Sequence, residues 1–137
     1  MMATLKLNRL HLHLTDNEGW RIQIEKYPNL TEYGAWRMGN TWKEFNDSGR
    51  KFVRQGTAGA YGGYYSKDDV RELVAYAKER NITIIPEIEM PGHALAAIAS
   101  LPQLACTPNP SAPVAEMCIG KESSIQILKD ILTEVME

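Results

Sequence analysis

The sequence has little of several features that would set its class at once. Its 137 residues include two cysteines, three histidines and no apolar run long enough to span a membrane. The formal net charge is only −2, so charge gives no reason to expect a nucleic acid or an anionic membrane as partner. No secretory signal opens the chain and no internal repeat interrupts it. These absences leave the compartment open.

What remains is the composition of a globular protein, with 44% apolar and 23% charged residues. We expect one domain over residues 1–137, and both of its ends look cut. Residues 1–4 run into a strand with no start signal. The last apolar helical stripe stops at Met136 with neither glycine nor proline to end it.

The stretch over residues 82–93 organises the chain. It opens as a β-branched apolar run, which predicts a strand buried on both faces. Alternation places Ile85, Glu87 and Glu89 on one face. The strand then breaks at a proline and a glycine and presents His93. Carboxylates and a histidine at a strand end favour an active site, although solvent-capped carboxylates at the tip of a buried strand would look the same.

Residues 5–14 predict the first strand, with leucines on one face and arginine and histidines on the other. A turn follows and leaves Asp16 at the carboxyl end, and residues 20–24 alternate like a short strand. Residues 27–65 form a long connection, typical of a functional loop. Its aromatic residues could stack on sugars or simply pack the loop.

A helix is predicted from an N-cap at Ser66 to Asn81, which tolerates the left-handed conformation. Strand, connection, helix and strand make a βαβ unit with parallel strands. Residues 94–100 predict a short helix, and Ser123 with Gln126 could cap a final one. Cys106 and Cys118 flank a loop containing Pro108, Pro110 and Pro113, and they could form a disulfide or stay free thiols.

Two arrangements compete for the chemistry. His11 and His13 share one strand face at a spacing that can hold a metal, with His93 as the third histidine. The other arrangement needs no metal and uses the strand-end groups Asp16, Glu89 and His93. In it, a carboxylate fixes a histidine that tunes a catalytic acid.

Five blocks in order carry a resemblance to family 20 glycoside hydrolases, the β-N-acetylhexosaminidases. They are residues 11–21 (HLHLTDNEGWR), 26–31 (KYPNLT), 34–37 (GAWR), 64–69 (YYSKDD) and 86–93 (PEIEMPGH). Asn17 and Glu89 depart from the pattern, since aspartate is common at both. The resemblance implies a partial (β/α)8 TIM barrel: about two βα units, a long loop and a following helix. The family's catalytic Asp-Glu dipeptide occurs nowhere in this chain.

The resemblance also implies what the parent enzyme does. It would release terminal N-acetylglucosamine or N-acetylgalactosamine from glycans by substrate-assisted, retaining catalysis, without metal or cofactor. Asp16 and His93 would be supporting catalytic residues of a proton relay, Glu89 a lesser residue near the substrate and Trp20 a packing residue. We expect this fragment alone to be inactive and to self-associate. A carbohydrate-binding or scaffolding fragment is the alternative, ahead of a metal-dependent barrel hydrolase.

Overall fold

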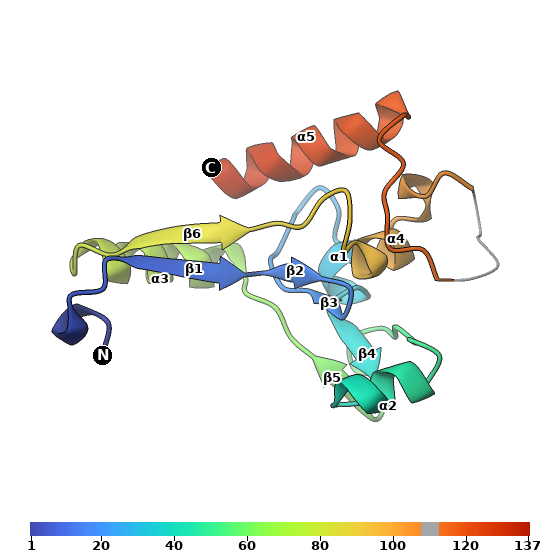
Figure 1. Cartoon of the computed structure of the whole chain (residues 1–137), viewed down its shortest axis with the longest axis horizontal. Coiled ribbons are helices and arrows are strands. Elements are labelled where there is room, and N and C mark those ends of the chain that lie inside the picture. Colours follow the sequence, from blue (N-terminus) through green and yellow to red (C-terminus); the bar gives the residue numbers. More distant parts are fainter. Residues whose placement is uncertain (108–112) are drawn as a thin grey trace.

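A parallel strand pair forms the spine of the chain. The computed structural model describes residues 1–107 and 113–137. Strand β1 (Arg9–His13) pairs with β6 (Thr83–Glu87) in parallel, with Arg9 opposite Thr83 and His13 opposite Glu87. Helix α3 (Lys67–Lys78) lies along the pair and packs against β6 (Figure 1). The βαβ unit with parallel strands is therefore confirmed.

The first strand is shorter than the predicted residues 5–14. Ala3–Leu5 instead form a 3-10 helix, η1, and Lys6 follows in the left-handed region with φ of 57°. The ladder begins where β6 can pair with it, because the Thr83 amide donates to the Asn8 carbonyl at 2.9 Å. Within β1 the predicted alternation holds, with the leucines half-buried and Arg9, His11 and His13 exposed.

The second strand is not buried on both faces, as its apolar run predicted. It ends at Glu87, and Ile85 is 39% exposed. The reason is the sheet: β1 is the only strand paired with β6 among the described residues, so one edge and much of one face stay open. The apolar run thus correctly indicated a strand, but this chain contains only some of the neighbouring elements that would bury it.

Helix α3 begins after the predicted N-cap, and its last residue is Lys78, with Asn81 in the turn that closes it. The Ser66 hydroxyl accepts the Asp69 amide at 3.1 Å, and the Asp69 carboxylate accepts the Ser66 amide at 2.8 Å, which makes a capping box. Asn81 closes the helix with φ of 54°. Of the apolar residues of α3 only Ala77 is buried, and Val74 is 46% exposed.

The long connection over residues 27–65 is folded rather than a loop. It contains α1 (Asn29–Glu32), β4 (Trp36–Met38), α2 (Trp42–Asp47) and β5 (Ala60–Gly62), and β4 pairs antiparallel with β5. The strand predicted over residues 20–24 reduces to β3 (Gly19–Trp20), which pairs with β2 (Thr15–Asp16). Short hairpin partners escaped prediction because each strand has only two or three residues.

The C-terminal part consists of α4 (Leu95–Ser100), a 3-10 helix η2 (Pro102–Leu104) and α5 (Glu122–Met136). The short helix confirms the prediction over residues 94–100. The predicted cap by Ser123 is wrong, because α5 begins at Glu122 and its cap position is Lys121, two residues before Ser123, without a side-chain cap. The loop predicted at Pro108 and Pro110 lies outside the described residues. None of the helices described here has the length and apolarity needed to cross a membrane.

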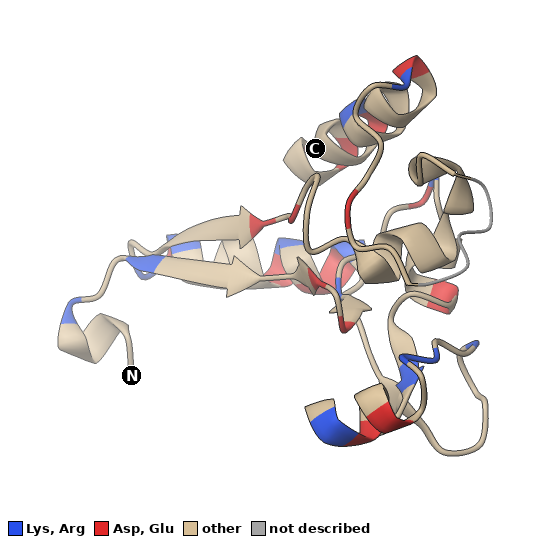
Figure 2. Ribbon diagram, turned by 45° about the vertical axis from the view of Figure 1, so that its right-hand side comes forward, with Lys and Arg blue, Asp and Glu red and all other residues tan. Residues whose placement is uncertain are grey.

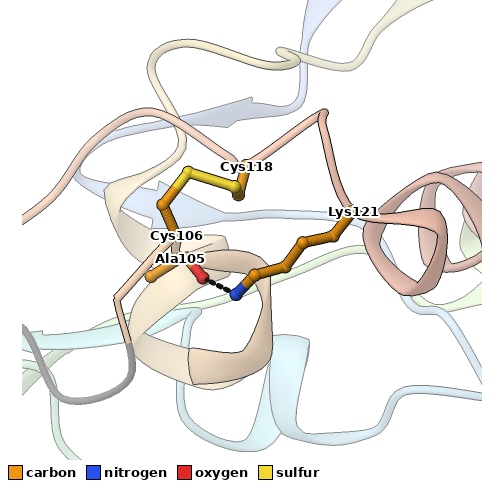
Figure 3. The surroundings of a disulfide bond; sticks show 4 residues. All are labelled: Ala105, Cys106, Cys118 and Lys121. Carbon is orange, nitrogen blue, oxygen red and sulfur yellow. Dashed lines mark hydrogen bonds between the residues drawn. A yellow bond between two sulfur atoms is a disulfide. The ribbon is translucent and has the colours of Figure 1, made fainter.

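The buried core lies mostly beyond the carboxyl ends of the strand pair, and Leu12 of β1 packs against its margin. It gathers residues of β3, α1, α2, α4, η2 and α5 with the segments between them, and we call this the apolar lobe. Trp20 is 1% exposed and donates its indole N–H to the Ile22 carbonyl at 2.7 Å, which confirms its packing role. A disulfide joins Cys106 to Cys118 and decides between the two predicted thiol states (Figure 3).

Candidate functional site

The carboxyl ends of β1 and β6 lie side by side, and the chain stays paired beyond them. The Leu14 amide donates to the Glu87 carbonyl at 3.2 Å. One step further, the Glu89 amide donates to the Thr15 hydroxyl at 2.7 Å. Acidic residues follow the tips of both strands (Figure 2). The two segments that carry the predicted site residues are therefore fixed to each other.

Asp16 and His93 meet at this edge, as their positions in the sequence predicted. The His93 Nδ1 lies 2.9 Å from an Asp16 carboxylate oxygen, and Asp16 also accepts the Asn17 amide at 2.6 Å. The hydrogen bond from His93 to Asp16 raises the pKa of the His93 imidazole, and the negative charges of Asp16 and Glu89 add to that rise. The protonated imidazole is thus favoured, and it donates to the carboxylate.

His13 is the hub of a second cluster that sequence reasoning did not assign. Its Nε2 lies 3.4 Å from Asp16, 3.5 Å from Glu87 and 3.9 Å from the predicted site residue Glu89. The signal was present in the sequence, because strand alternation puts His11 and His13 on one face and the pairing puts Glu87 beside them. His11 Nε2 accordingly lies 2.5 Å from the other Glu87 oxygen.

The cluster bears on the alternative of a three-histidine metal site. Among the described residues, the group whose ligand atoms converge is His13, Glu87 and Glu89, with those atoms within 4.8 Å of one another. His11 instead faces Glu87, and His93 faces Asp16. The three histidines are therefore not gathered around one point. The carboxylates beside His13 have the geometry to hold a cation, but exposed acidic groups of this kind are common without one.

Asn17 and two arginines hold the turn that carries Asp16; the sequence marked Asn17 only as a departure from the family pattern and gave the arginines no role. The Asn17 side chain accepts the Leu95 amide at 3.2 Å and so ties the turn to the start of α4. Arg21 and Arg37 each donate to the Glu18 carbonyl at 3.2 Å. Burial lowers the pKa of Arg21, and the neighbouring charge of Arg37 lowers it further. Both arginines donate to backbone carbonyls, and the pattern of charged residues in the sequence does not predict such partners.

An open hollow of about 470 Å³ lies beside His13. Tyr61, Tyr64 and Tyr65 line it together with residues 12–14 and Arg21. Tyr61 and Tyr65 come from the connection predicted either to stack on sugars or to pack the loop. Both are nearly half exposed, so in this chain they do not serve as core residues. That these tyrosines stack on sugars stays a prediction.

The comparisons with known proteins all indicate the same enzyme family. The whole chain, residues 1–137, matches the catalytic domain of glycosyl hydrolase family 20. It is 43% identical over 142 residues to a beta-hexosaminidase of Porphyromonas gingivalis, covering 98% of this chain and 16% of that protein. It is 48% identical over 100 residues to the N,N'-diacetylchitobiase of Vibrio harveyi, covering 73% of this chain and 11% of that protein.

Solved structures extend the likeness to three dimensions. The beta-N-acetylhexosaminidase of Bacteroides fragilis is 42% identical with a TM-score of 0.76, covering 99% of this chain and 24% of that one. A family 20 exo beta-N-acetylglucosaminidase of Vibrio harveyi, solved with N-acetylglucosamine, is 36% identical with a TM-score of 0.78. That match covers 98% of this chain and 21% of the solved one. The chain thus spans about a quarter or less of these relatives.

The family match covers every residue, and the structural likeness includes the strand pair, the folded connection and the helices that follow. The sequence blocks that predicted the family surround the Asp16–His93 pair. The chain belongs to the catalytic domain of glycosyl hydrolase family 20.

Proposed function

We propose that this chain is part of the (β/α)8 barrel of an exo-acting β-N-acetylhexosaminidase. In this proposal β1 and β6 are two neighbouring strands of the barrel, and residues outside this chain supply the others. The substrate is a glycan that ends in N-acetylglucosamine or N-acetylgalactosamine. The names of the relatives support this, and so does the position of the polar cluster at the carboxyl ends of parallel strands, where barrel enzymes keep their active sites.

The hydrogen bond between Asp16 and His93, 2.9 Å long, carries the proposal. It occupies Nδ1 and fixes the ring, so Nε2 is the nitrogen that can reach a further acid. That acid would be a glutamate from outside this chain, which contains no Asp-Glu dipeptide. Asp16 and His93 are then positioning residues for a proton transfer made by another group.

The chemistry that fits is substrate-assisted hydrolysis. The outside glutamate protonates the glycosidic oxygen, while the oxygen of the substrate's 2-acetamido group attacks the anomeric carbon; the bond from that carbon to the glycosidic oxygen breaks, and the rest of the glycan leaves as an alcohol. Water then opens the resulting ring, and the same glutamate acts as base. His93 keeps the proton affinity of that glutamate suited to both steps. Glu89, close to His13, is a lesser contributor near the substrate.

The test is made in the full-length protein that carries these residues. We expect His93→Ala and Asp16→Asn each to lower kcat on a 4-nitrophenyl N-acetyl-β-glucosaminide by about 10²-fold, with a smaller change in KM. The reason is that the relay acts on a proton transfer in the transition state.

Arg71→Ala is the matched control, because Arg71 lies on the exposed face of α3 and, within residues 1–107 and 113–137, pairs only with the exposed Asp68. Its turnover should equal that of the unchanged protein. Turnover that is also unchanged in both His93→Ala and Asp16→Asn would show that the relay is not used.

A further inference from the structure

The loop that presents His93 is held by a distant segment of the chain. Pro91, at the start of this loop, accepts the Met117 amide at 2.8 Å. Ala94, at its end, donates its amide to the Ala115 carbonyl, also at 2.8 Å. The two hydrogen bonds bracket Gly92 and His93. We call residues 91–94 the His93 loop and residues 115–118 the clasp segment.

The clasp segment is itself fixed on its other side. The Cys118 amide donates to the Leu104 carbonyl at 2.7 Å, and the Cys118 sulfur is bonded to Cys106 (Figure 3). The Lys121 ammonium adds a hydrogen bond of 2.5 Å to the Ala105 carbonyl. Met117 is buried in the apolar lobe. The disulfide therefore joins the clasp segment covalently to the residue pair that follows η2, and η2 itself packs against α4 and α5.

His93 needs such support because of its backbone. Its φ is 51°, in the left-handed region that residues other than glycine adopt at a cost. Such a conformation persists where surrounding contacts determine it. The contact with Asp16 is made by the side chain alone, and the two backbone bonds to the clasp segment flank the strained residue. Loss of the clasp would let the loop relax and move the imidazole.

We propose that the disulfide between Cys106 and Cys118 is a positioning element of the site, which acts through the clasp segment to hold His93 against Asp16. This rests on the proposed function only for its effect on turnover. The hold on the loop is a structural statement that can be measured without any substrate. It assigns to the disulfide a local task beyond its general contribution to stability.

The experiment compares the full-length protein with its Cys106→Ser/Cys118→Ser variant, both well below their melting temperatures. We expect faster hydrogen exchange in peptides that cover residues 91–95 and 115–118 of the variant. We also expect kcat to fall about tenfold with little change in KM. A misplaced catalytic group can lower the rate by ~10²-fold, and loosening the loop should cause part of that loss. Dithiothreitol should reproduce both effects in the unchanged protein and add nothing in the variant. It supplies two electrons and two protons, gives two thiols and closes to its own cyclic disulfide.

Two further variants separate positioning from stability. Ile131→Ala removes a fully buried side chain of α5, so it should lower the melting temperature without changing exchange at residues 91–95 or kcat. In a His93→Ala background the serine substitutions should cause no further loss of kcat, because the route through His93 is already broken.

Exchange at residues 91–95 that does not change on loss of the disulfide would overturn the proposal. So would an equal fall of kcat in the His93→Ala background, since the effect would then not pass through His93. If His93→Ala alone keeps full turnover, the proposed function fails. The exchange measurement would still decide whether the disulfide holds the loop.

Discussion

The strand pair with α3 and the apolar lobe are built on opposite principles. No residue of β1 or β6 is buried, and of α3 only Ala77 is. The lobe holds the fully buried side chains, among them Trp20, Leu30 and Phe45. The part that resembles a barrel is thus ordered by backbone pairing, whereas the part made of connections carries the hydrophobic core. The connections at the carboxyl ends of the strands can keep their own shape, while the strands need partners.

This difference explains how the site is held. Asp16 and His93 sit in segments that follow the strands, and contacts from the lobe fix them. Asn17 binds the start of α4, and the His93 loop binds the clasp segment. His11 and His13, by contrast, lie on the strand pair itself and are half exposed or more. The two halves of the polar cluster therefore depend on different sources of stability.

The largest expected effect is the absence of activity in this chain by itself. With no Asp-Glu dipeptide, it should hydrolyse no 4-nitrophenyl N-acetyl-β-glucosaminide at any protein concentration. The open edges of the strand pair should instead make it self-associate, which sedimentation velocity would detect as species larger than the monomer. A monomer that cleaves the substrate would contradict both the proposed source of the acid and the comparison of the two regions.

A matched leucine pair tests the comparison in free energy. Leu30 is 0% exposed in the lobe, whereas Leu10 is only half-buried on β1. In this chain Leu30→Ala should lower the free energy of unfolding by about 2–5 kcal/mol and Leu10→Ala by well under that. Urea unfolding of both variants measures the two losses.

The same pair sharpens the comparison in the full-length protein. There, neighbouring strands and helices should cover β1, so Leu10→Ala should become nearly as costly as Leu30→Ala. Equal costs in the chain alone would show that β1 is already packed as well as the lobe. A small Leu10 cost in the full-length protein would argue against a closed barrel around β1.

Local chemistry made much of this architecture predictable. The N-cap at Ser66 and the left-handed Asn81 depend on neighbours in sequence, and both were predicted correctly. The meeting of Asp16 with His93 followed from two parallel strands that end at one edge. The prediction that β6 is buried on both faces was wrong, because the apolar residues of a strand suit the complete sheet in which it is packed. This chain pairs the strand on one side only.

The folded connection and the clasp were beyond prediction for a different reason. Strands β2 to β5 are two or three residues long, too short for any periodicity to be seen. Arg21 and Arg37 act through carbonyl oxygens, whose positions only the fold determines. The capping pattern at Ser123 was real in sequence, but α5 begins before it. Backbone partners far apart in the chain leave no mark in residue types.

The smallest expected effect concerns a polar latch that joins α5 to residues 26–27, just before α1. Asp130 accepts hydrogen bonds from Lys26 at 2.7 Å, from the Tyr27 hydroxyl at 2.6 Å and from Gln126 at 3.0 Å. These bonds, that of Lys26 first, lower the pKa of Asp130 to about 2. Burial and the bond to Asp130 raise the pKa of Tyr27 to about 12.

The signs of the two shifts define where the latch acts. The stabilisation from Asp130 is present above its ordinary pKa of 3.8 and is lost as the pH falls through about 2. The contribution of Tyr27 is present below its ordinary pKa of 10.0 and is lost as the pH rises through about 12. Between these limits docking of α5 should not vary with pH through either group. Asp130→Asn should therefore reduce the fall of the unfolding free energy at acid pH. Between the two limits it should not make that free energy depend on pH.

Urea unfolding at a series of pH values measures that slope, and carbon-13 resonances of the Asp130 carboxyl report its pKa directly. Tyr27→Phe should move this pKa up from about 2 toward its ordinary value, because one of the three hydrogen bonds is gone. Asp68→Asn is the control, since that carboxylate is almost fully exposed and should leave the acid slope unchanged. An Asp130 pKa that is the same in the Tyr27→Phe variant would show that Lys26 and Gln126 hold the carboxylate without the tyrosine. The latch would then rest on Lys26 and Gln126, beside the other polar hold on α5, where the Glu134 carboxylate accepts the Glu25 and Lys26 amides and pairs with Lys67 at 3.0 Å.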